Sequence, residues 1–349
     1  MGQLVLLTGC LNNYTEKTPV EIKRQQSTSF DYFDTVSYIF SYANDEKEIF
    51  DNNTNKVFEI LGEYHQLFDI YNAHYDKDDK QINNLYTVNR KAGKEPVVVD
   101  QKLIDFLKYT KEIYEITKGE TNVMFGSVLK IWHKAREDAS FAENYYVPTM
   151  DKLTEANKYS SIDLLEIDDE NNTVFIKDAN ARIDVGAIGK GYATEMAARY
   201  LESIGCNAYV LNIGGNIRIV GSRLDGSGWN TGVTNPRRLT PDDPAYSLYI
   251  NIKDISCVTS GDYERYYTVD GKRYHHIIDK DTLMPADYFS SITVLVKDSG
   301  LADALSTALF AMPYEEGLEL VESLEDVEVI WIDKDGKVTY TSGVTPINL

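Results

Sequence analysis

The sequence has few cysteines, and none of them has metal-binding spacing. The three are Cys10, Cys206 and Cys257. No two of them form a CxxC pair, which excludes a zinc ribbon or a dithiol redox motif of that type. Cys206 and Cys257 stand in apolar surroundings and are expected to be inert core residues. Cys10 differs from both because it follows an apolar run near the start of the chain.

Basic residues and long apolar runs are also scarce. The 349 residues include 35 Lys and Arg against 55 Asp and Glu, a net charge of −20. This balance argues against nucleic acid as a partner and against a basic face that lies on an anionic membrane. No segment approaches the roughly 18 apolar residues that a membrane-spanning helix needs. The acidity is consistent with a well-solvated surface.

The first ten residues resemble a bacterial lipoprotein signal. The apolar run Leu4 to Leu7 leads into Thr8-Gly9-Cys10, and in such signals the cysteine becomes lipidated. We therefore expect an extracytoplasmic protein attached to the membrane only through a lipid at Cys10. The signal is incomplete, because no Lys or Arg precedes a short apolar run; a clipped start and an accidental match are the two explanations. We assign residues 1–28 to a signal remnant and polar tether, and 29–349 to one folded domain.

Hydrophobic spacing predicts helices and many short strands. An amphipathic stripe from Val57 to Tyr71 predicts a long helix. Aromatic and β-branched residues predict a strand over Phe30–Tyr42, and strand patterns dominate the second half of the chain. Further helices are expected over 102–118, 150–159, 301–311 and 314–324, whereas 134–149 is charged and is expected to be irregular. The pattern indicates an α+β fold with mixed or largely antiparallel sheets and packed helices.

A glycine loop lies at the centre of the pattern. A strand over Ala181–Val185 is expected to run through Asp184-Val-Gly-Ala-Ile-Gly-Lys-Gly191 into a helix. Free N–H groups, the helix dipole and Lys190 would converge there, a combination that suits a phosphate. The glycine spacing fits neither a Walker loop nor a dinucleotide fingerprint. A plain strand-to-helix turn is the alternative.

Two further stretches carry groups suited to catalysis. Asp303 and Thr307 stand four residues apart, so they share one face of an apolar helix. Mg²⁺ would satisfy their oxygens, although Asp303 would also serve as a helix cap or as the partner of a lysine. The adjacent His275 and His276 would point to opposite faces of a strand, so at most one is expected to face a site, and a structural histidine is the alternative for each.

Five motifs in this order together resemble the ApbE family of FAD:protein FMN transferases. They are DVGAIGKGYATE, LNIGGNI, TSGDYERYY, YHHIID and ADALSTALF. Weaker matches are FDYFDT near residue 33, YN…INNL at 71–85 and TKGETN at 117–122. The resemblance extends from about residue 30 to about residue 345, and its specificity comes from the ordered set.

The resemblance implies an activity and a site. Such proteins bind FAD and Mg²⁺, cleave the pyrophosphate, attach FMN to a Thr or Ser of an acceptor with a D-G-x-[ST]-x-T segment, and release AMP. It implies that one of the two adjacent histidines is catalytic, and we favour His276. The residues that it implies for FAD are Phe33, Tyr71, Glu120, Thr121, Asn122, Asp184, Lys190 and Ile277. The residues that it implies for the metal are Ala187 (through its carbonyl), Asp303 and Thr307.

Three departures from the family pattern stand out. Asn122 occupies a position that is Asp in many members, and this departure bears most on the identity or affinity of the metal. Asp279-Lys-Asp-Thr-Leu283 replaces Asp-Pro-x-Thr-Gly, and Phe33-Asp34-Thr35 replaces Met-Gly-Thr. Two other activities fit the same residues: an FAD pyrophosphatase with water as the acceptor, and a flavin-binding lipoprotein that releases no AMP.

Overall fold

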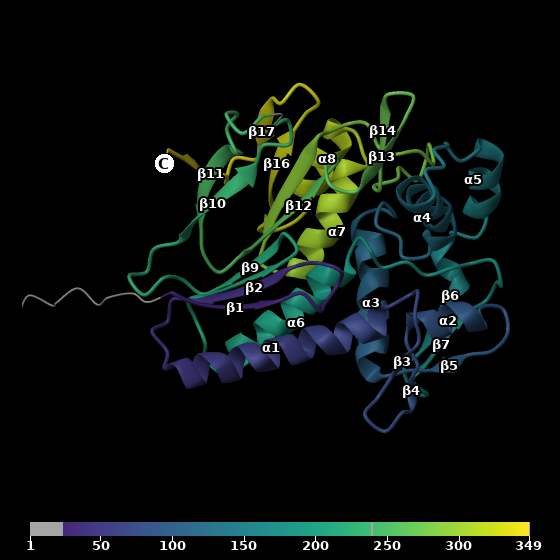
Figure 1. The fold of residues 1–349 in the computed structure, drawn as a ribbon, viewed down its shortest axis with the longest axis horizontal. Coiled ribbons are helices and arrows are strands. Elements are labelled where there is room, and N and C mark those ends of the chain that lie inside the picture. Colours follow the sequence, from purple (N-terminus) through teal and green to yellow (C-terminus); the bar gives the residue numbers. More distant parts are fainter. Residues whose placement is uncertain (1–23, 239, 349) are drawn as a thin grey trace, which may run out of the picture.

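The computed structural model describes residues 24–238 and 240–348, and its largest element is an antiparallel sheet of eight strands (Figure 1). Every neighbouring pair in this main sheet is antiparallel. In spatial order its strands are β1 (Gln25–Ser29), β2 (Ser37–Ser41), β8 (Tyr209–Ile213), β9 (Asn216–Val220), β12 (Ser256–Gly261), β15 (Ser291–Val296), β16 (Glu328–Ile332) and β17 (Val338–Tyr340).

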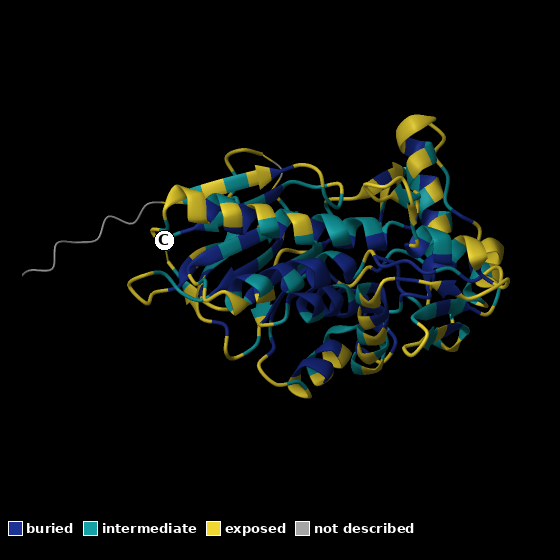
Figure 2. Cartoon of the chain, turned by 90° about the horizontal axis from the view of Figure 1, so that it is seen from below, coloured by how far each residue is buried: buried dark blue, intermediate teal, exposed yellow. Residues whose placement is uncertain are grey.

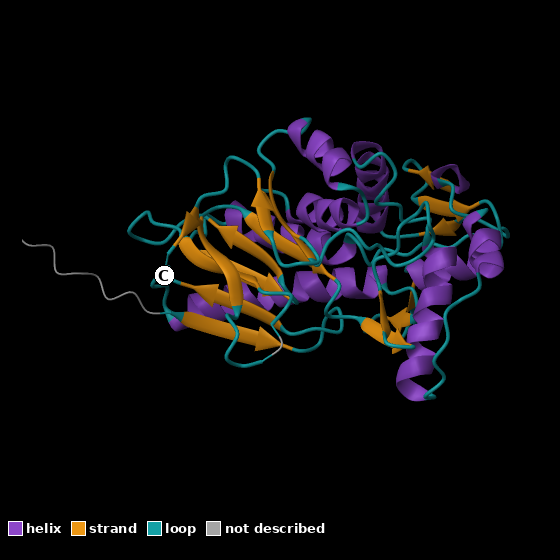
Figure 3. Ribbon diagram, turned by 90° about the horizontal axis from the view of Figure 1, so that it is seen from above, coloured by secondary structure: helices purple, strands orange, loops and turns teal. Residues whose placement is uncertain are grey.

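Helices cover one face of the main sheet. Helix α7 (Ser299–Phe310) contacts β12 and β15, and α6 (Gly189–Ser203) packs between α7 and the long helix α1 (Lys47–Phe68). Alternate strand residues such as Val258 and Val294 meet Leu305 and Leu309 of α7 in one buried cluster. The fourth helix on this side, α8 (Tyr314–Glu322), contributes Leu320 and Val321. Helices and strands therefore form separate layers, as Figure 3 shows.

A small sheet packs on the opposite face of the main sheet. Its strands, in spatial order, are β10 (Trp229–Thr234), β11 (Tyr246–Ile252) and β18 (Pro346–Ile347). Trp229, Val233 and Ile250 of this sheet join Cys257 and Leu295 of the main sheet in a second cluster. Cys257 and Val258 thus face opposite layers, as the two-residue period of a strand requires.

The remaining elements form a second region beside α1 and α6 (Figure 1). Its helices are α2 (Leu85–Lys91), α3 (Gln101–Ile116), α4 (Gly126–Phe141), α5 (Met150–Asn157) and the 3₁₀ turn η1 (Ile162–Leu164). Its strands are β3 (His74–Tyr75), β4 (Gln81–Ile82), β5 (Val97–Val98), β6 (Leu165–Asp168), β7 (Thr173–Ile176), β13 (Tyr266–Val269) and β14 (Lys272–His275).

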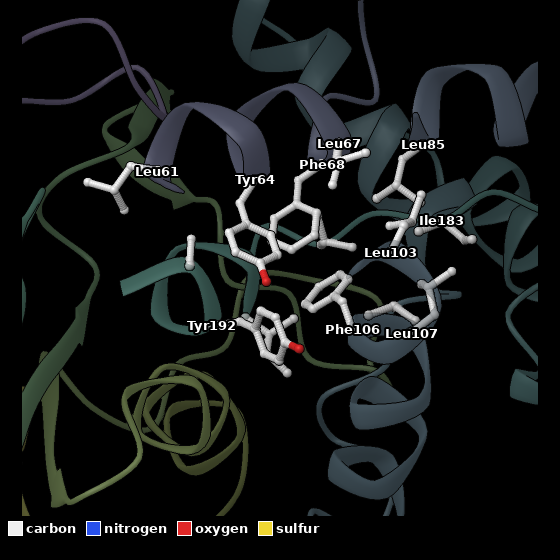
Figure 4. Close-up of a cluster of buried hydrophobic side chains, with 14 of the residues drawn as sticks. Leu61, Tyr64, Leu67, Phe68, Leu85, Leu103, Phe106, Leu107, Ile183 and Tyr192 are labelled. Carbon is white, nitrogen blue, oxygen red and sulfur yellow. The ribbon is translucent and has the colours of Figure 1, made fainter. Parts of the chain in front are cut away.

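Aromatic side chains connect the two regions. Phe68 of α1, Phe106 of α3 and Tyr192 of α6 meet in one cluster, with the Phe68 and Phe106 ring centroids 4.0 Å apart (Figure 4). All three are buried, whereas the outer faces of the helices are exposed (Figure 2). Burial of each such ring contributes about 1.5–3 kcal/mol, so this contact fixes α1, α3 and α6 against one another.

The predicted α+β class and the largely antiparallel pairing are confirmed, but several predicted elements are wrong. Phe30–Tyr42 is not one strand, because a turn with Phe33 and Asp34 at positive φ separates β1 from β2. Residues 134–141 continue α4 and are not irregular, and Ala181–Val185 is no strand but makes only a single bridge from Arg182 to Phe125. Strand β14 ends at His275. Helix α2 was not expected.

The N-terminal assignment is tested only at its edge. Strand β1 begins at Gln25, so residues 25–28 belong to the main sheet and not to the tether. Cys10 lies outside the described residues. None of the helices within residues 24–238 and 240–348 is long and apolar enough to span a membrane.

Candidate functional site

A cleft of about 1430 Å³ begins at the junction of α6, α7 and the main sheet. Every site residue predicted within the described part of the chain lines it, although these residues come from stretches that lie far apart in the sequence. They are Phe33, Tyr71, Glu120, Thr121, Asn122, Asp184, Ala187, Lys190, His276, Ile277, Asp303 and Thr307. The volume exceeds the roughly 300–1,000 Å³ of sites for drug-sized ligands, so the cleft accepts a larger molecule or two ligands together.

The glycine loop ends in the first turn of α6, where Asp303 of α7 meets it. The backbone N–H of Gly191 donates to the Asp303 carboxylate at 2.8 Å. The N-cap of α7 itself is Asp298, whose carboxylate accepts from the N–H of Leu301. Asp303 therefore does not cap its own helix, and the carboxylate instead accepts from an otherwise free N–H at the positive end of α6.

The close contact of α6 and α7 requires a glycine at 191. A Cβ atom there would lie 2.3 Å from the Ser299 carbonyl oxygen and 2.4 Å from Asp303 Cβ. Backbone atoms cannot yield to such an overlap as a flexible side chain would. Gly191 thus gives Asp303 access to the first turn of α6.

Asp303 is buried beside a lysine. Burial raises the pKa of its carboxyl, while Lys190, the Gly191 N–H and Asn216 act in the opposite direction. The Lys190 ammonium donates to the Asn216 side-chain oxygen at 3.0 Å. A carboxylate in this position lacks solvent and is stabilised by further positive charge.

Hydroxyl groups surround Thr307 one turn further along α7. The Ser260 hydroxyl at the end of β12 lies 2.8 Å from the Ser306 hydroxyl and 3.5 Å from that of Thr307. Ala187 stands in the turn before α6 and lines the same cleft. The carboxylate of Asp303, the hydroxyl of Thr307 and a carbonyl of the glycine loop are oxygen donors of the kind that hard cations take.

His275 and His276 face different spaces. His276 lines the cleft, and its Nδ1 is buried without a hydrogen-bond partner among the described residues. His275 is bonded through Nε2 to the Ala286 carbonyl oxygen at 2.8 Å and lines a separate pocket. The expectation that only one of the pair faces the site is therefore confirmed, and the structural role falls to His275.

Burial and neighbouring cationic groups keep His276 neutral. Burial, followed by the guanidinium groups of Arg265 and Arg136, lowers the pKa of His276 to about 3. Arg136 is itself half-buried, and this loss of solvent lowers its pKa. Neither arginine forms an ion pair within the described part of the chain, so both remain available to an anion.

The sequence did not single out Arg136 and His133 of α4. Residues 134–149 were expected to be irregular, so the helical spacing of these two residues was not used. The Tyr71 hydroxyl lies 2.8 Å from His133 Nδ1, and the Asp184 carboxylate lies 3.9 Å from the same nitrogen. A three-residue spacing on a helix that begins at Gly126 was the signal that would have found them.

A strained turn carries Phe33 into the cleft. Phe33 and Asp34 have φ values of 56° and 52°, a region that favours glycine. The Phe33 N–H donates to His65 Nδ1 at 3.2 Å, and Thr35 lies against Gly214, where a Cβ would approach Thr35 Oγ1 to 2.3 Å. These contacts hold the turn over the loop between β8 and β9.

The loop at 120–122 is fixed by bonds to the rest of the protein. Thr121 donates to the Ala304 carbonyl at 2.8 Å, which attaches the loop to α7. Asn122 donates through Nδ2 to the Ser160 carbonyl at 2.7 Å and accepts from the Met124 N–H at 2.9 Å. Glu120 pairs with Lys280 at 3.0 Å. Asn122 thus has a structural reason to be an amide, since a carboxylate cannot donate to a carbonyl.

Comparison with known proteins identifies the family. A model of the ApbE family matches residues 20–331. The FAD:protein FMN transferase of Treponema pallidum (strain Nichols) is 32% identical over 288 residues, which covers 77% of this chain and 75% of that protein. The FAD:protein FMN transferase of Vibrio cholerae serotype O1 is 32% identical over 274 residues and 77% of each chain.

Solved structures agree with this match. The structure is similar to the crystal structure of the ApbE protein from Thermotoga maritima, with a TM-score of 0.77, 27% identity and coverage of 92% of this chain and 97% of that one. The flavin transferase ApbE from Vibrio cholerae gives a TM-score of 0.73 at 26% identity, with coverage of 92% and 97%. The chain therefore belongs to the ApbE family.

Proposed function

We propose that this protein is an Mg²⁺-dependent FAD:protein FMN transferase that attaches FMN to a hydroxyl of an acceptor protein and releases AMP. The relatives named FAD:protein FMN transferase support flavin transfer as the reaction. One structural observation supports the location of the reaction. Groups suited to binding phosphate, binding a cation and transferring a proton line a single cleft, with Lys190, Asp303 and His276 among them.

The donor set of the cleft fits Mg²⁺. Asp303, Thr307 and the Ala187 carbonyl would hold the ion. No cluster of three His, Cys, Asp or Glu residues able to hold a metal occurs within the described ranges. Mg²⁺ needs no such cluster, because it is commonly bound by one or two carboxylates together with substrate phosphates and water. When bound, it would polarise the pyrophosphate and offset its developing charge.

The cations of the cleft would bind the anionic part of FAD. Lys190 stands beside Asp303, and Arg136 and Arg265 stand beside His276. None of these three cations forms an ion pair with a carboxylate of the described residues. Each is therefore available to pair with a phosphate oxygen of FAD. Phe33, with its ring held by the strained turn, would contact an aromatic part of FAD.

His276 would accept the proton of the acceptor hydroxyl. In the reaction, this oxygen bonds to the FMN phosphorus, the bond from that phosphorus to the AMP oxygen breaks, and AMP leaves. The neutral imidazole lines the cleft, and its Nδ1 has no hydrogen-bond partner among the described residues, so the ring is able to accept the proton. Phosphate bound near Arg136 and Arg265 would offset their charge and raise the pKa of His276 from its low value, so basicity would increase when FAD is present.

AMP release from FAD tests this assignment. We expect release with Mg²⁺, suppression by EDTA, and strong dependence on Asp303. AMP without a modified acceptor would indicate the pyrophosphatase, with water in place of the hydroxyl. Tight FAD binding without AMP would indicate a flavin-binding protein and overturn the proposal.

Lipid attachment at Cys10 and an extracytoplasmic location complete the proposal. They are supported by the Leu-Thr-Gly-Cys sequence behind an apolar run. Metabolic labelling with a radioactive fatty acid, compared between the wild type and Cys10→Ser, tests the attachment. Equal labelling of both proteins would contradict it. The acceptor segment of the D-G-x-[ST]-x-T type is likewise part of the proposal.

A further inference from the structure

Strand β10 borders the cleft along its full length. All six of its residues, Trp229 to Thr234, line the cleft. Successive side chains of a strand point to opposite faces, so a cavity that lies on one face touches only every second residue. Strand β8 shows this alternation with Val210 and Asn212, as β9 does with Ile217 and Ile219. The cleft therefore crosses the face of the main sheet and runs along the edge of β10.

The edge of β10 that faces the cleft has no strand beside it. Within the described ranges β10 pairs only with β11, and it is the outermost strand of the small sheet. Such an edge presents a row of free N–H and C=O groups that pair readily with an added strand. Trp229 also has a buried indole N–H without a partner among the described residues. These donors and acceptors suit a peptide backbone.

The space beside this edge leads to the groups proposed for catalysis. Its floor is the apolar face of the main sheet, with Ile217, Ile219 and Cys257. Two residues beyond Cys257, Thr259 lines the cleft, followed by Ser260, whose hydroxyl meets Thr307. A strand placed along β10 would direct alternate side chains onto this floor and would end near Thr307.

The shape and charge of this space favour an extended acceptor segment. A cleft of about 1430 Å³ cannot admit a folded domain, but it admits a few residues of extended chain. The protein carries a net charge of −20, yet Arg24, Arg136 and Arg265 all line this cleft, and none of the three forms an ion pair within the described residues. A segment with an acidic residue near its Ser or Thr would match that local charge.

We infer that the acceptor protein binds by adding an extended strand to the free edge of β10, which delivers its hydroxyl to the site. The inference rests on the proposed function, because it names how the acceptor of that reaction enters. Main-chain hydrogen bonds to β10 would supply affinity, and side chains that meet the floor would supply selectivity.

Amide hydrogen exchange of the full chain, with FAD and an acceptor fragment that carries an Asp-Gly-x-Ser-x-Thr segment, tests the inference. We expect alternate amides of β10 to exchange at least tenfold more slowly with the fragment present, because only every second N–H faces the free edge. Full protection of all β10 amides without the fragment would overturn the inference, since the edge would then be covered by the chain itself.

Two adjacent proline substitutions provide a second test. Successive N–H groups point to opposite sides, so of Asn230→Pro and Thr231→Pro one removes a bond to β11 and the other removes only an outward N–H. We expect the variant that loses only an outward N–H to keep the wild-type unfolding midpoint and FAD affinity, whereas its FMN transfer should fall at least tenfold. Normal transfer in both variants would overturn the inference alone. Absence of transfer by the wild type would overturn the proposed function, and the inference with it.

Discussion

The Asp303 carboxylate of α7 accepts a hydrogen bond from the Gly191 N–H in the first turn of α6. The two residues are 112 positions apart in sequence. This bond places a buried carboxylate at the positive end of a helix, beside Lys190. It joins the glycine loop to the helix that carries Thr307, so two motifs that the sequence presents separately form one site.

Gly191→Ala should destabilise the protein. The new Cβ would overlap Ser299 and Asp303, and overpacking of this kind costs about 1–3 kcal/mol. The free energy of unfolding in urea measures the loss. Gly317→Ala in α8 is the control, because its nearest atom is a flexible Leu309 methyl carbon at 3.2 Å, and it should be neutral or stabilising. Equal stability of the two variants would contradict the tight α6–α7 contact.

Asp303→Asn should lower activity and raise stability. The amide oxygen still accepts from Gly191, but the negative charge is lost, and we expect Mg²⁺-dependent AMP release to fall about 100-fold. Burial raises the pKa of Asp303, so its ionised form opposes folding, and stability without Mg²⁺ falls as pH rises through that pKa. The neutral amide should therefore increase the free energy of unfolding at pH 7.

Asp262→Asn is the matched control for that variant. Burial acts against the charge of Asp262, but Arg237 and Lys334 keep its pKa below the ordinary value. Its charge contributes stability above the unfolded pKa, so the amide should destabilise the protein while AMP release persists. Opposite stability effects of the two substitutions support the assignment. Loss of AMP release in the Asp262→Asn variant alone would contradict it.

His276 should make the protein sensitive to acid. Burial and the neighbouring arginines lower its pKa from 6.5 to about 3, so below pH 6.5 the unfolded chain takes up a proton that the folded protein does not. Stability is then lost as pH falls from 6.5 toward 3. When the pH is lowered from 7 to 5, the free energy of unfolding of the His276→Gln variant should fall by up to about 2 kcal/mol less than that of the wild type. Parallel urea unfolding series for the two proteins would contradict this.

Asn122→Asp should not restore a missing function. The substitution removes the donor to the Ser160 carbonyl and places a carboxylate there, which costs about 1–3 kcal/mol. FMN transfer per folded molecule should not rise. Asn83→Asp is the control, since its amide donates to the Val98 carbonyl at 2.8 Å in an exposed position and its loss should cost less. Greater stability and activity in the Asn122→Asp variant would show that the amide is a defect in the site.

The residues that line the site were predicted from the sequence more accurately than the bounds of the helices and strands around it. The stripe from Val57 to Tyr71 predicted only the second part of α1, which begins earlier, at Lys47, and ends at Phe68. The ordered motifs and the weaker matches together predicted twelve residues in the described part of the chain, and all of them line one cleft. Such motifs are informative because phosphate and cation chemistry restrict residue type and spacing together.

The failures have physical causes. Helix α4 continues through charged residues because its outer face is solvated, so hydrophobic spacing alone did not reveal it or Arg136. The strand pattern over Phe30–Tyr42 could not show that Phe33 and Asp34 turn the chain at positive φ, since neither is a glycine. The edge of β10 was also beyond prediction, because which strand ends a sheet depends on tertiary pairing.

The intact mass of an acceptor fragment after incubation with FAD, Mg²⁺ and this protein tests the central claim most directly. We predict a mass increase equal to one FMN phosphoryl group on a single Ser or Thr, with one AMP released for each modified fragment. Asp303→Asn should show neither. An unmodified fragment together with AMP release would contradict transfer in favour of hydrolysis, and an unmodified fragment without AMP would contradict the cleft as a catalytic site.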